Sequence, residues 1–168
     1  MMSRMKRVSH TLTYPGTTVD EVFAMFGDPA YREAVSVYQH VKDFSCDITP
    51  TDAGMNVRVE QAHGTERIPG FAQKLVGDEI RFVQEETWSS PASADMHVTI
   101  PGKPGEMSGT EALTRAGSDV VQTIELSIKV SIPFVGGKVE DLIADFIGKA
   151  FDAENKVGVK WLHGEWRV

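Results

Sequence analysis

The first pattern along the chain is a strict alternation of apolar and polar residues. It predicts a strand from Val8 to Tyr14, which Pro15-Gly16 ends. Thr17 or Thr18 is expected as the N-cap of a helix, and Glu21 lies three residues after Thr18, the spacing of a capping box. After a break at Gly27-Asp28-Pro29, residues 30–37 are expected to form a second short helix.

Strand patterns then dominate the middle of the chain. The segment from Tyr38 to Thr49 has an apolar face, and alternating segments recur around Val57, Phe82 and Met96. The clearest strand spans residues 120–132, with one face formed by Val120, Ile124, Leu126, Ile128, Val130 and Ile132. Short polar turns separate these segments, as in an antiparallel meander.

The period becomes helical after residues 132–137. From Lys138 to about His163, apolar residues at spacings of three and four form one broad stripe, made by Val139, Leu142, Ile143, Phe146, Ile147, Ala150, Phe151, Val157 and Trp161. Gly148 and Gly158 are each expected to weaken this helix by about 1 kcal/mol relative to Ala. The element order, with about six or seven strands before a long C-terminal helix, predicts an α+β fold in which that helix covers the sheet.

The composition is that of a globular protein. The chain has 168 residues, of which 41% are hydrophobic and 24% charged, so it is long enough to bury a core. We therefore expect one domain over residues 1–168. The formal net charge of −7 argues against a nucleic-acid partner, because binding to phosphates needs clustered basic charge.

The cysteine content and the N-terminus suggest a compartment. Cys46 is the single cysteine, so an intramolecular disulfide is impossible and a reducing compartment is expected, with a lone thiol in a secreted chain as the alternative. The basic start, Met1 to Arg7, is not followed by the apolar core of a signal peptide. No apolar run reaches the length of about eighteen residues that a membrane span needs. The expected location is the cytoplasm, without stable membrane insertion.

The element order from Val8 to His163 resembles the helix-grip fold of the START-like superfamily, which includes the birch-pollen allergen, polyketide cyclase/dehydrases and lipid-transfer domains. The junction Ile-Pro-Phe-Val-Gly-Gly-Lys-Val-Glu at residues 132–140, with its acidic opening Glu140-Asp141, is similar to an actinobacterial family of unknown function within that superfamily. The resemblance implies a sheet curled around the long helix, with a cavity between them. It implies no single reaction, because a fold carries function poorly.

A curved sheet under a long helix leaves a wedge, which becomes an apolar pocket wherever side chains do not fill it. A filled core is the alternative. The residues expected to contact a ligand in such a pocket come from the sheet and from the last helix: Trp88, Met96, Val98, Leu113, Ile124, Leu126, Ile128, Phe146, Ile147, Ala150 and Phe151. Residues 67–71 are expected to form a loop near the cavity mouth, where Pro69 and Phe71 would gate entry or Phe71 would only anchor the loop.

Few polar residues share the inward side of the predicted strands. An inward Glu86 would need a partner such as Arg58, Arg115 or a ligand group, because a buried carboxylate is costly unless it is paired. We expect instead that a bulge or a strand end turns Glu86 to solvent. His40 and His97 are expected to be structural residues.

Metal and cofactor binding are not expected. The histidines at positions 10, 40, 63, 97 and 163 show no paired ligand spacing, and Cys46 has no second thiol beside it.

These observations favour a binding protein over an enzyme. The leading interpretation is intracellular binding or transport of a small hydrophobic or amphipathic molecule that is lipid-, sterol- or polyketide-like. The alternative is a cyclase/dehydratase-type enzyme in the same cavity, for which Glu86, His40 and His97 are the candidate titratable groups. A protein-interaction module would instead need a closed interior and a large exposed apolar patch. The sequence identifies neither the ligand nor a protein partner.

Overall fold

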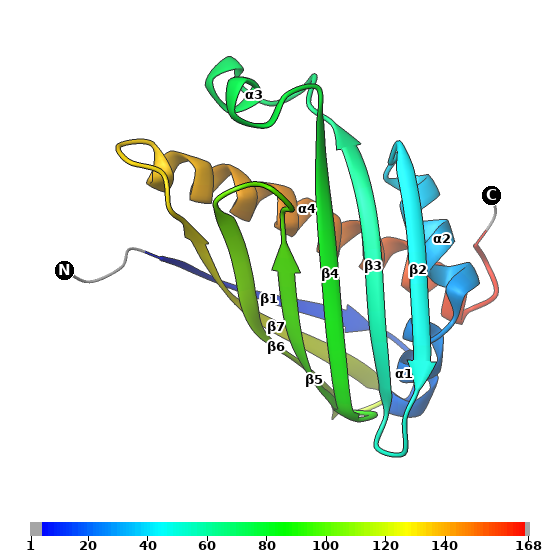
Figure 1. The fold of residues 1–168 in the computed structure, drawn as a ribbon. Helices are drawn as coiled ribbons and strands as arrows, with labels where there is room; N and C mark the ends of the chain where they lie inside the picture. The colour runs from blue at the N-terminus through cyan, green and yellow to red at the C-terminus, as the bar shows by residue number, and fades with distance from the viewer. Residues whose placement is uncertain (1–4, 167–168) are drawn as a thin grey trace.

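The computed structural model describes residues 5–166. Within this range one antiparallel sheet has the strand order β1-β7-β6-β5-β4-β3-β2, so the first two strands of the chain lie at opposite edges (Figure 1). The strands are β1 (Lys6–Tyr14), β2 (Asp43–Pro50), β3 (Met55–Gly64), β4 (Glu79–Ser90), β5 (Ser93–Thr99), β6 (Gly105–Ala116) and β7 (Asp119–Val130). The connection between the two edge strands is made by α1 (Val19–Phe26) and α2 (Pro29–Tyr38).

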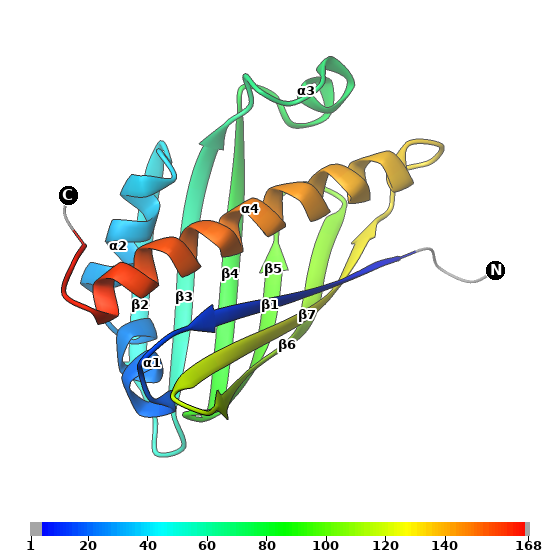
Figure 2. The same ribbon diagram turned by 180° about the vertical axis from the view of Figure 1, so that it is seen from behind.

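A long helix crosses one face of the sheet. This helix, α4 (Gly136–Leu162), has 27 residues and runs diagonally across the strands, in front of them in Figure 2. Along β7 the even-numbered residues from Val120 to Val130 are buried, and most of the others are partly exposed. The sheet thus has one apolar face that needs a cover. The helix-grip architecture predicted from the element order is confirmed.

The N-cap of α1 forms where the sequence predicted it, and the structure adds a cap for α2. The hydroxyl of Thr18 accepts a hydrogen bond from the Glu21 backbone N–H (3.2 Å) and donates one to the Glu21 carboxylate (3.0 Å), so the two residues of the predicted capping box are paired. Asp28 caps α2 by accepting from the backbone N–H of Ala30 (2.9 Å). Pro29 occupies the first turn of α2, where its missing N–H costs nothing.

The strand predicted from Tyr38 begins too early. Tyr38 ends α2, and β2 starts at Asp43. The helix continues this far because its buried stripe, which includes Tyr31 and Val35, packs into the core. His40 then reverses the chain with a φ of 57°.

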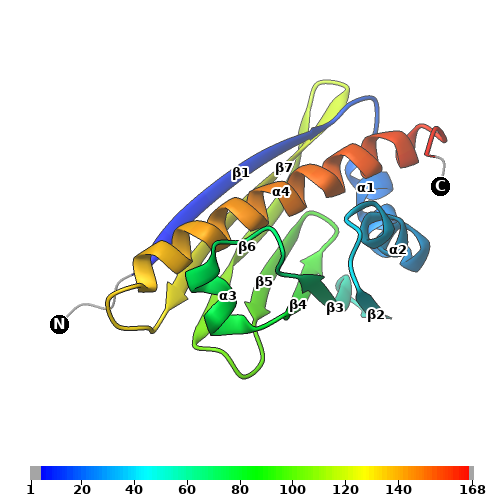
Figure 3. The ribbon, with the colours of Figure 1, turned by 90° about the horizontal axis from the view of Figure 1, so that it is seen from above.

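A short helix, α3 (Gly70–Val76), joins β3 to β4 where the sequence predicted only a loop. It spans seven residues, so it contains too few turns for a helical period to be recognised. Pro69 precedes its first turn. The helix lies beside the N-terminal half of α4, as the view from above shows (Figure 3).

Among residues 5–166, no helix is long and apolar enough to cross a membrane. The expectation that no signal peptide is present rests on Met1 to Arg7, of which the first four residues lie outside the described part of the chain.

Gly158 lies where α4 passes closest to the N-terminal elements. A Cβ at this position would come within 2.8 Å of Tyr14 Cε1 and 3.0 Å of Met25 Cε. At Gly148 the nearest atom would be Cε1 of the half-buried His10 ring, at 3.2 Å. Gly158 therefore allows α4 to pack closely against Tyr14 and Met25. At Gly148 an added methyl group would meet only the edge of the His10 ring, which can shift.

We predict that Gly158→Ala lowers the free energy of unfolding by about 1–3 kcal/mol, because overpacking outweighs the gain of about 1 kcal/mol in helix propensity. Gly148→Ala, the matched control, should be neutral or slightly stabilising. Urea unfolding followed by circular dichroism measures both, and equal stabilities of the two variants would contradict the prediction.

Candidate functional site

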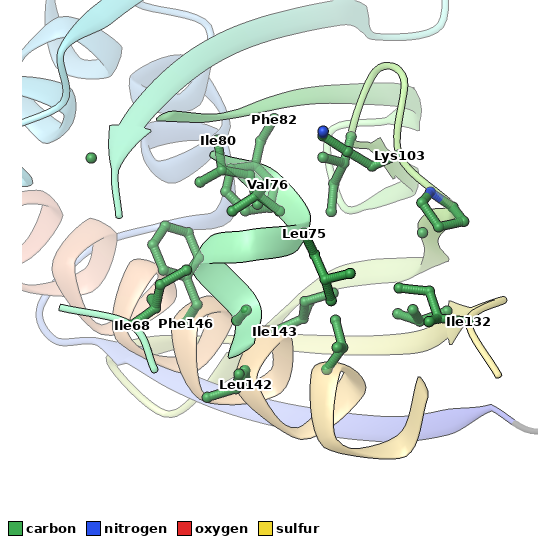
Figure 4. Close-up of a pocket in the computed structure, with 17 residues that line it drawn as sticks. Ile68, Leu75, Val76, Ile80, Phe82, Lys103, Ile132, Leu142, Ile143 and Phe146 are labelled. Atoms are coloured by element: carbon green, nitrogen blue, oxygen red, sulfur yellow. The ribbon is translucent and has the colours of Figure 1, made fainter. Parts of the chain in front are cut away.

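An apolar cavity of about 210 Å³ lies between α3, the N-terminal half of α4 and the adjacent end of the sheet (Figure 4). It is partly open to solvent. Its lining residues are nearly all without polar side chains: Gly64, Ile68, Ala72, Leu75, Val76, Ile80, Phe82, Ile100, Lys103, Pro104, Gly105, Val130, Ile132, Val139, Leu142, Ile143 and Phe146. Lys103, on the loop between β5 and β6, is the one charged residue among them.

Three elements form the body of this cavity. Val76 of α3 lies beside Ile80 of β4, Leu75 of α3 points into the cavity, and Leu142 of α4 lies on the opposite side (Figure 4). The Lys103 side chain extends from its loop along the cavity (Figure 4). The short helix that the sequence did not predict therefore supplies one wall.

An aromatic wall closes the inner end of the cavity. The rings of Phe82 and Phe146 are stacked, with centroids 5.0 Å apart and an interplanar angle of 16°. The His63 ring packs edge-on against both, at 5.8 Å from Phe82 and 4.8 Å from Phe146. Burial lowers the pKa of His63, so its ring is neutral in this wall.

A second cavity, of about 50 Å³, begins on the other side of Phe82. Its lining is more polar and includes Arg32, Gln61, Gln84 and Glu154. This volume is far below the 300–1,000 Å³ or so of pockets for drug-sized ligands. It admits only a small group, such as the end of a larger molecule.

Next to it, Glu86 forms a buried ion pair with Arg32. Their side chains are 2% and 6% exposed, and the guanidinium nitrogens lie 3.0 and 3.3 Å from the two carboxylate oxygens. Gln84 Nε2 (2.7 Å) and Trp88 Nε1 (2.9 Å) donate to the same carboxylate. Burial alone would raise the pKa of Glu86, but Arg32 and these hydrogen bonds lower it to about 2.

The expectation that Glu86 turns to solvent is therefore wrong, and Arg32 is its partner. The β4 alternation stays regular through Glu86 and shifts register only between Trp88 and Ser90. Arg58 instead pairs with Glu85 and Glu60 on the exposed face. Arg115 donates to the carbonyl of Gly117.

Glu111 of β6 is a second buried carboxyl beside Glu86. It is 3% exposed and accepts a hydrogen bond from Gln122 Nε2 (2.9 Å) through one oxygen, whereas its other oxygen accepts no hydrogen bond from the described residues. Burial and the charge of Glu86 raise the pKa of Glu111 well above its usual range. This shift favours the protonated form of Glu111, whose hydroxyl can donate a hydrogen bond to Glu86.

Glu154 of α4 is the carboxyl of this group that faces a cavity. Its Oε1 lies 3.9 Å from Arg32 Nη1, and its side chain is 20% exposed. Burial raises the pKa of Glu154 to about 7, against the opposing effect of Arg32. A carboxyl that titrates near neutral pH at the edge of a cavity can both accept and donate a proton.

The structure places the sequence-predicted ligand residues in four different surroundings. Phe146 lines the large cavity, and Ala150 and Phe151 line the small one. The following eight belong to the buried core: Trp88, Met96, Val98, Leu113, Ile124, Leu126, Ile128 and Ile147. Phe71 is 39% exposed and lies outside both linings. Ligand contact by these twelve residues stays a prediction.

The polar residues that sequence analysis missed carry a readable signal. Glu111 has the same parity as Met107 and Leu113 in β6, and Glu154 lies three residues from both Phe151 and Val157 on the apolar stripe of α4. A charged residue in the middle of an apolar stripe indicates a buried polar network. His40 and His97 line neither cavity, and His97 is exposed beside Glu106.

No group of three or more potential metal ligands from His, Cys, Asp and Glu occurs within the described residues. Cys46 is half-buried on β2.

The sequence of residues 9–162 matches the model of a family described as "Protein of unknown function (DUF2505)". The chain belongs to this family. It is also 28% identical over 119 residues to Uncharacterized protein Rv0481c of Mycobacterium tuberculosis and to Uncharacterized protein Mb0491c of Mycobacterium bovis. Each alignment covers 66% of this chain and 67% of the relative.

Solved structures share the fold of this DUF2505 member at low sequence identity. The ZhuI aromatase/cyclase from Streptomyces sp. R1128 has a TM-score of 0.64 at 11% identity, with 98% of each chain covered. Truncated norcoclaurine synthase from Thalictrum flavum has a TM-score of 0.62 at 15% identity, with 94% of this chain and 96% of that chain covered. These likenesses confirm the expected helix-grip fold.

The titration of Glu154 leads to a prediction about stability. A raised carboxyl pKa means that the folded state holds more protons than the unfolded state between about pH 4.3 and 7. Stability should therefore fall as pH rises through this window. In Glu154→Gln this contribution is absent, so the stability of the variant relative to the wild type should rise by about 2–3 kcal/mol between pH 5 and pH 8.

Urea unfolding at both pH values tests this, with Glu33→Gln as the control. Glu33 is exposed on α2, so its substitution changes the net charge equally without touching the buried cluster. A constant difference between wild type and Glu154→Gln across the pH range would refute the prediction.

Proposed function

We propose that this protein binds a small hydrophobic or amphipathic molecule in the apolar cavity between α3, α4 and the sheet. The observation that carries the proposal is a partly open space of about 210 Å³ whose seventeen lining residues include a single charged one. Removing apolar ligand surface from water is worth about 25 cal/mol per Å² before the costs of association. The cytoplasmic location expected from the lone cysteine stays a prediction.

The size of the cavity limits the ligand. Pockets for drug-sized molecules usually measure about 300–1,000 Å³, so a space of about 210 Å³ suits a smaller molecule or one that extends through the mouth. Of the residues predicted to contact a ligand, Phe146 already lies in this cavity. A ligand in this cavity would reach the predicted contact residues beyond the Phe82–Phe146 wall only if that wall moved.

A substitution that fills the cavity should abolish binding. Ala72 of α3 lines the cavity, so Ala72→Phe would place a ring inside it. We expect the wild type to bind 1-anilinonaphthalene-8-sulfonate with enhanced fluorescence that decanol displaces. The Ala72→Phe affinity should be at least about tenfold lower, which corresponds to about 1.4 kcal/mol.

Ala24→Phe is the matched control, because Ala24 is an exposed helical alanine outside the cavity. Circular dichroism checks that both variants fold. The proposal fails if the wild type binds neither probe, or if folded Ala72→Phe binds as tightly as Ala24→Phe.

One observation favours an enzyme of the cyclase/dehydratase kind as the alternative. Glu154 combines a pKa of about 7 with a place at the small cavity, one ring away from the apolar cavity. A substrate chain in the large cavity could present a carbonyl-bearing end past Phe82. Glu154 would then take a proton from the carbon beside the carbonyl and return it, as a general acid–base group. The fold is shared with proteins named aromatase/cyclase and norcoclaurine synthase, which supports this alternative.

The original candidates for such chemistry are weaker. Glu86 already accepts four hydrogen bonds and stays ionised, while His40 and His97 lie outside both cavities. Glu154 is therefore the residue to test.

Deuterium exchange into 2-decanone tests this chemistry, since its alkyl chain suits the apolar cavity. If Glu154 acts as a base, the wild type should accelerate exchange beside the carbonyl by about a hundredfold or more in D₂O, and Glu154→Gln should lose this effect while Glu33→Gln keeps it. NMR follows the reaction. Exchange at the buffer rate would reject the enzyme alternative and leave the binding proposal intact.

A further inference from the structure

The lining of the large cavity dictates where a ligand can carry polar groups. Sixteen of its seventeen lining residues have no side-chain hydrogen-bond donor or acceptor. A ligand hydroxyl or carbonyl buried among them would lose its bonds to water without replacement. Molecules with polar groups along their whole length, as many polyketides have, are therefore poor ligands. A molecule with one polar end and an apolar remainder fits.

Lys103 supplies a partner for that polar end. Its side chain contributes to the cavity lining, yet the residue as a whole is exposed at the loop between β5 and β6. A lysine in this position can pack its methylenes against the cavity and keep its ammonium in water. Lys103 forms no salt bridge with any residue in the described range 5–166.

Four carboxylates at this end of the molecule have other cations beside them. Their ion pairs are Asp141 with Lys6, Glu66 with Lys42, Glu79 with Arg81 and Glu106 with His97. The last pair is charged only when His97 is protonated. Lys103 is thus left as a cation at the rim of an apolar cavity, which is the arrangement that suits an anionic headgroup.

The acidity of the whole chain does not cancel this local attraction. The formal net charge is −7, and it would repel an anion at long range. At physiological ionic strength, however, charges are screened over about 8 Å. A headgroup in contact with Lys103 therefore experiences that ammonium more strongly than the distant carboxylates.

We infer that the cavity holds the hydrocarbon chain of a single-headed anionic amphipath, of the fatty-carboxylate class, with the anionic head beside Lys103. This inference rests on the proposed binding function and narrows it from lipid-, sterol- or polyketide-like molecules to one class. A lysine ammonium acts as a point charge, so a sulfate head should serve nearly as well as a carboxylate.

The test compares three ligands with the same ten-carbon chain, namely decanoate, decyl sulfate and decanol. Calorimetric titration at pH 8 and below micelle-forming concentrations gives the affinities. The wild type should bind both anions about fivefold or more tightly than decanol. Lys103→Met keeps the apolar stem, so it should bind decanol unchanged and lose the preference for anions.

Lys129→Met is the matched control. Lys129 lies with Lys103 in a neighbouring surface hollow but not in the apolar cavity, so its loss should leave the anion preference in place. Raising the salt concentration should weaken the preference in wild type and have no such effect in Lys103→Met.

The outcomes separate this inference from the function on which it rests. If decanol and both anions fail to bind, the proposed function itself is wrong. If decanol binds but the anions bind no better, or if Lys103→Met keeps the anion preference, the headgroup assignment is overturned and the binding function stands.

Discussion

One long helix has to cover a sheet that is wider than the helix. Adjacent strands lie about 4.8 Å apart, so the seven strands span roughly 29 Å, whereas a helix with its side chains is only about 10–12 Å wide. The sheet must therefore curve around α4, and wedges remain on both sides of the helix. The interior of this protein is determined by how those wedges are filled.

Different elements fill the wedge at the two ends of α4. Near its C-terminal half, α1 and α2 close the wedge, and Arg32 brings a charge into the interior, where Glu86 neutralises it. Near its N-terminal half only α3 provides a cover, and space remains beneath it. Chemistry follows this division, because the closed end holds the ionisable groups and the open end holds almost only hydrocarbon.

Among the described residues, the buried cluster at the closed end contains three carboxyl groups, those of Glu86, Glu111 and Glu154, beside the one guanidinium of Arg32. Glu86 takes the ion pair, Glu111 keeps a proton, and Glu154 lies between these two extremes. Such a network contributes little net stability, since removing charges from water costs about as much as the pair regains. This network lies one aromatic ring away from the apolar cavity, and for that reason Glu154 is a candidate for acid–base chemistry on a bound molecule. The stacked rings of Phe82 and Phe146 lie between this network and the apolar cavity.

The sequence by itself determined the elements whose signals are local and long. The alternation of β7, the capping box at Thr18 and the apolar stripe of α4 depend only on near neighbours, and all three were read correctly. Even the inward direction of Glu86 was present in the β4 alternation, and it was misjudged because no partner was visible nearby.

Only the tertiary structure decided the partners and the empty space. Arg32 meets Glu86 across 54 residues of sequence, a separation over which no pattern of spacing carries information. The cavity likewise depends on a seven-residue helix too short to be read, placed against α4 by the path of the chain. Apolar residues look alike in sequence whether they fill a core or line a cavity, because the difference lies in what stands opposite them.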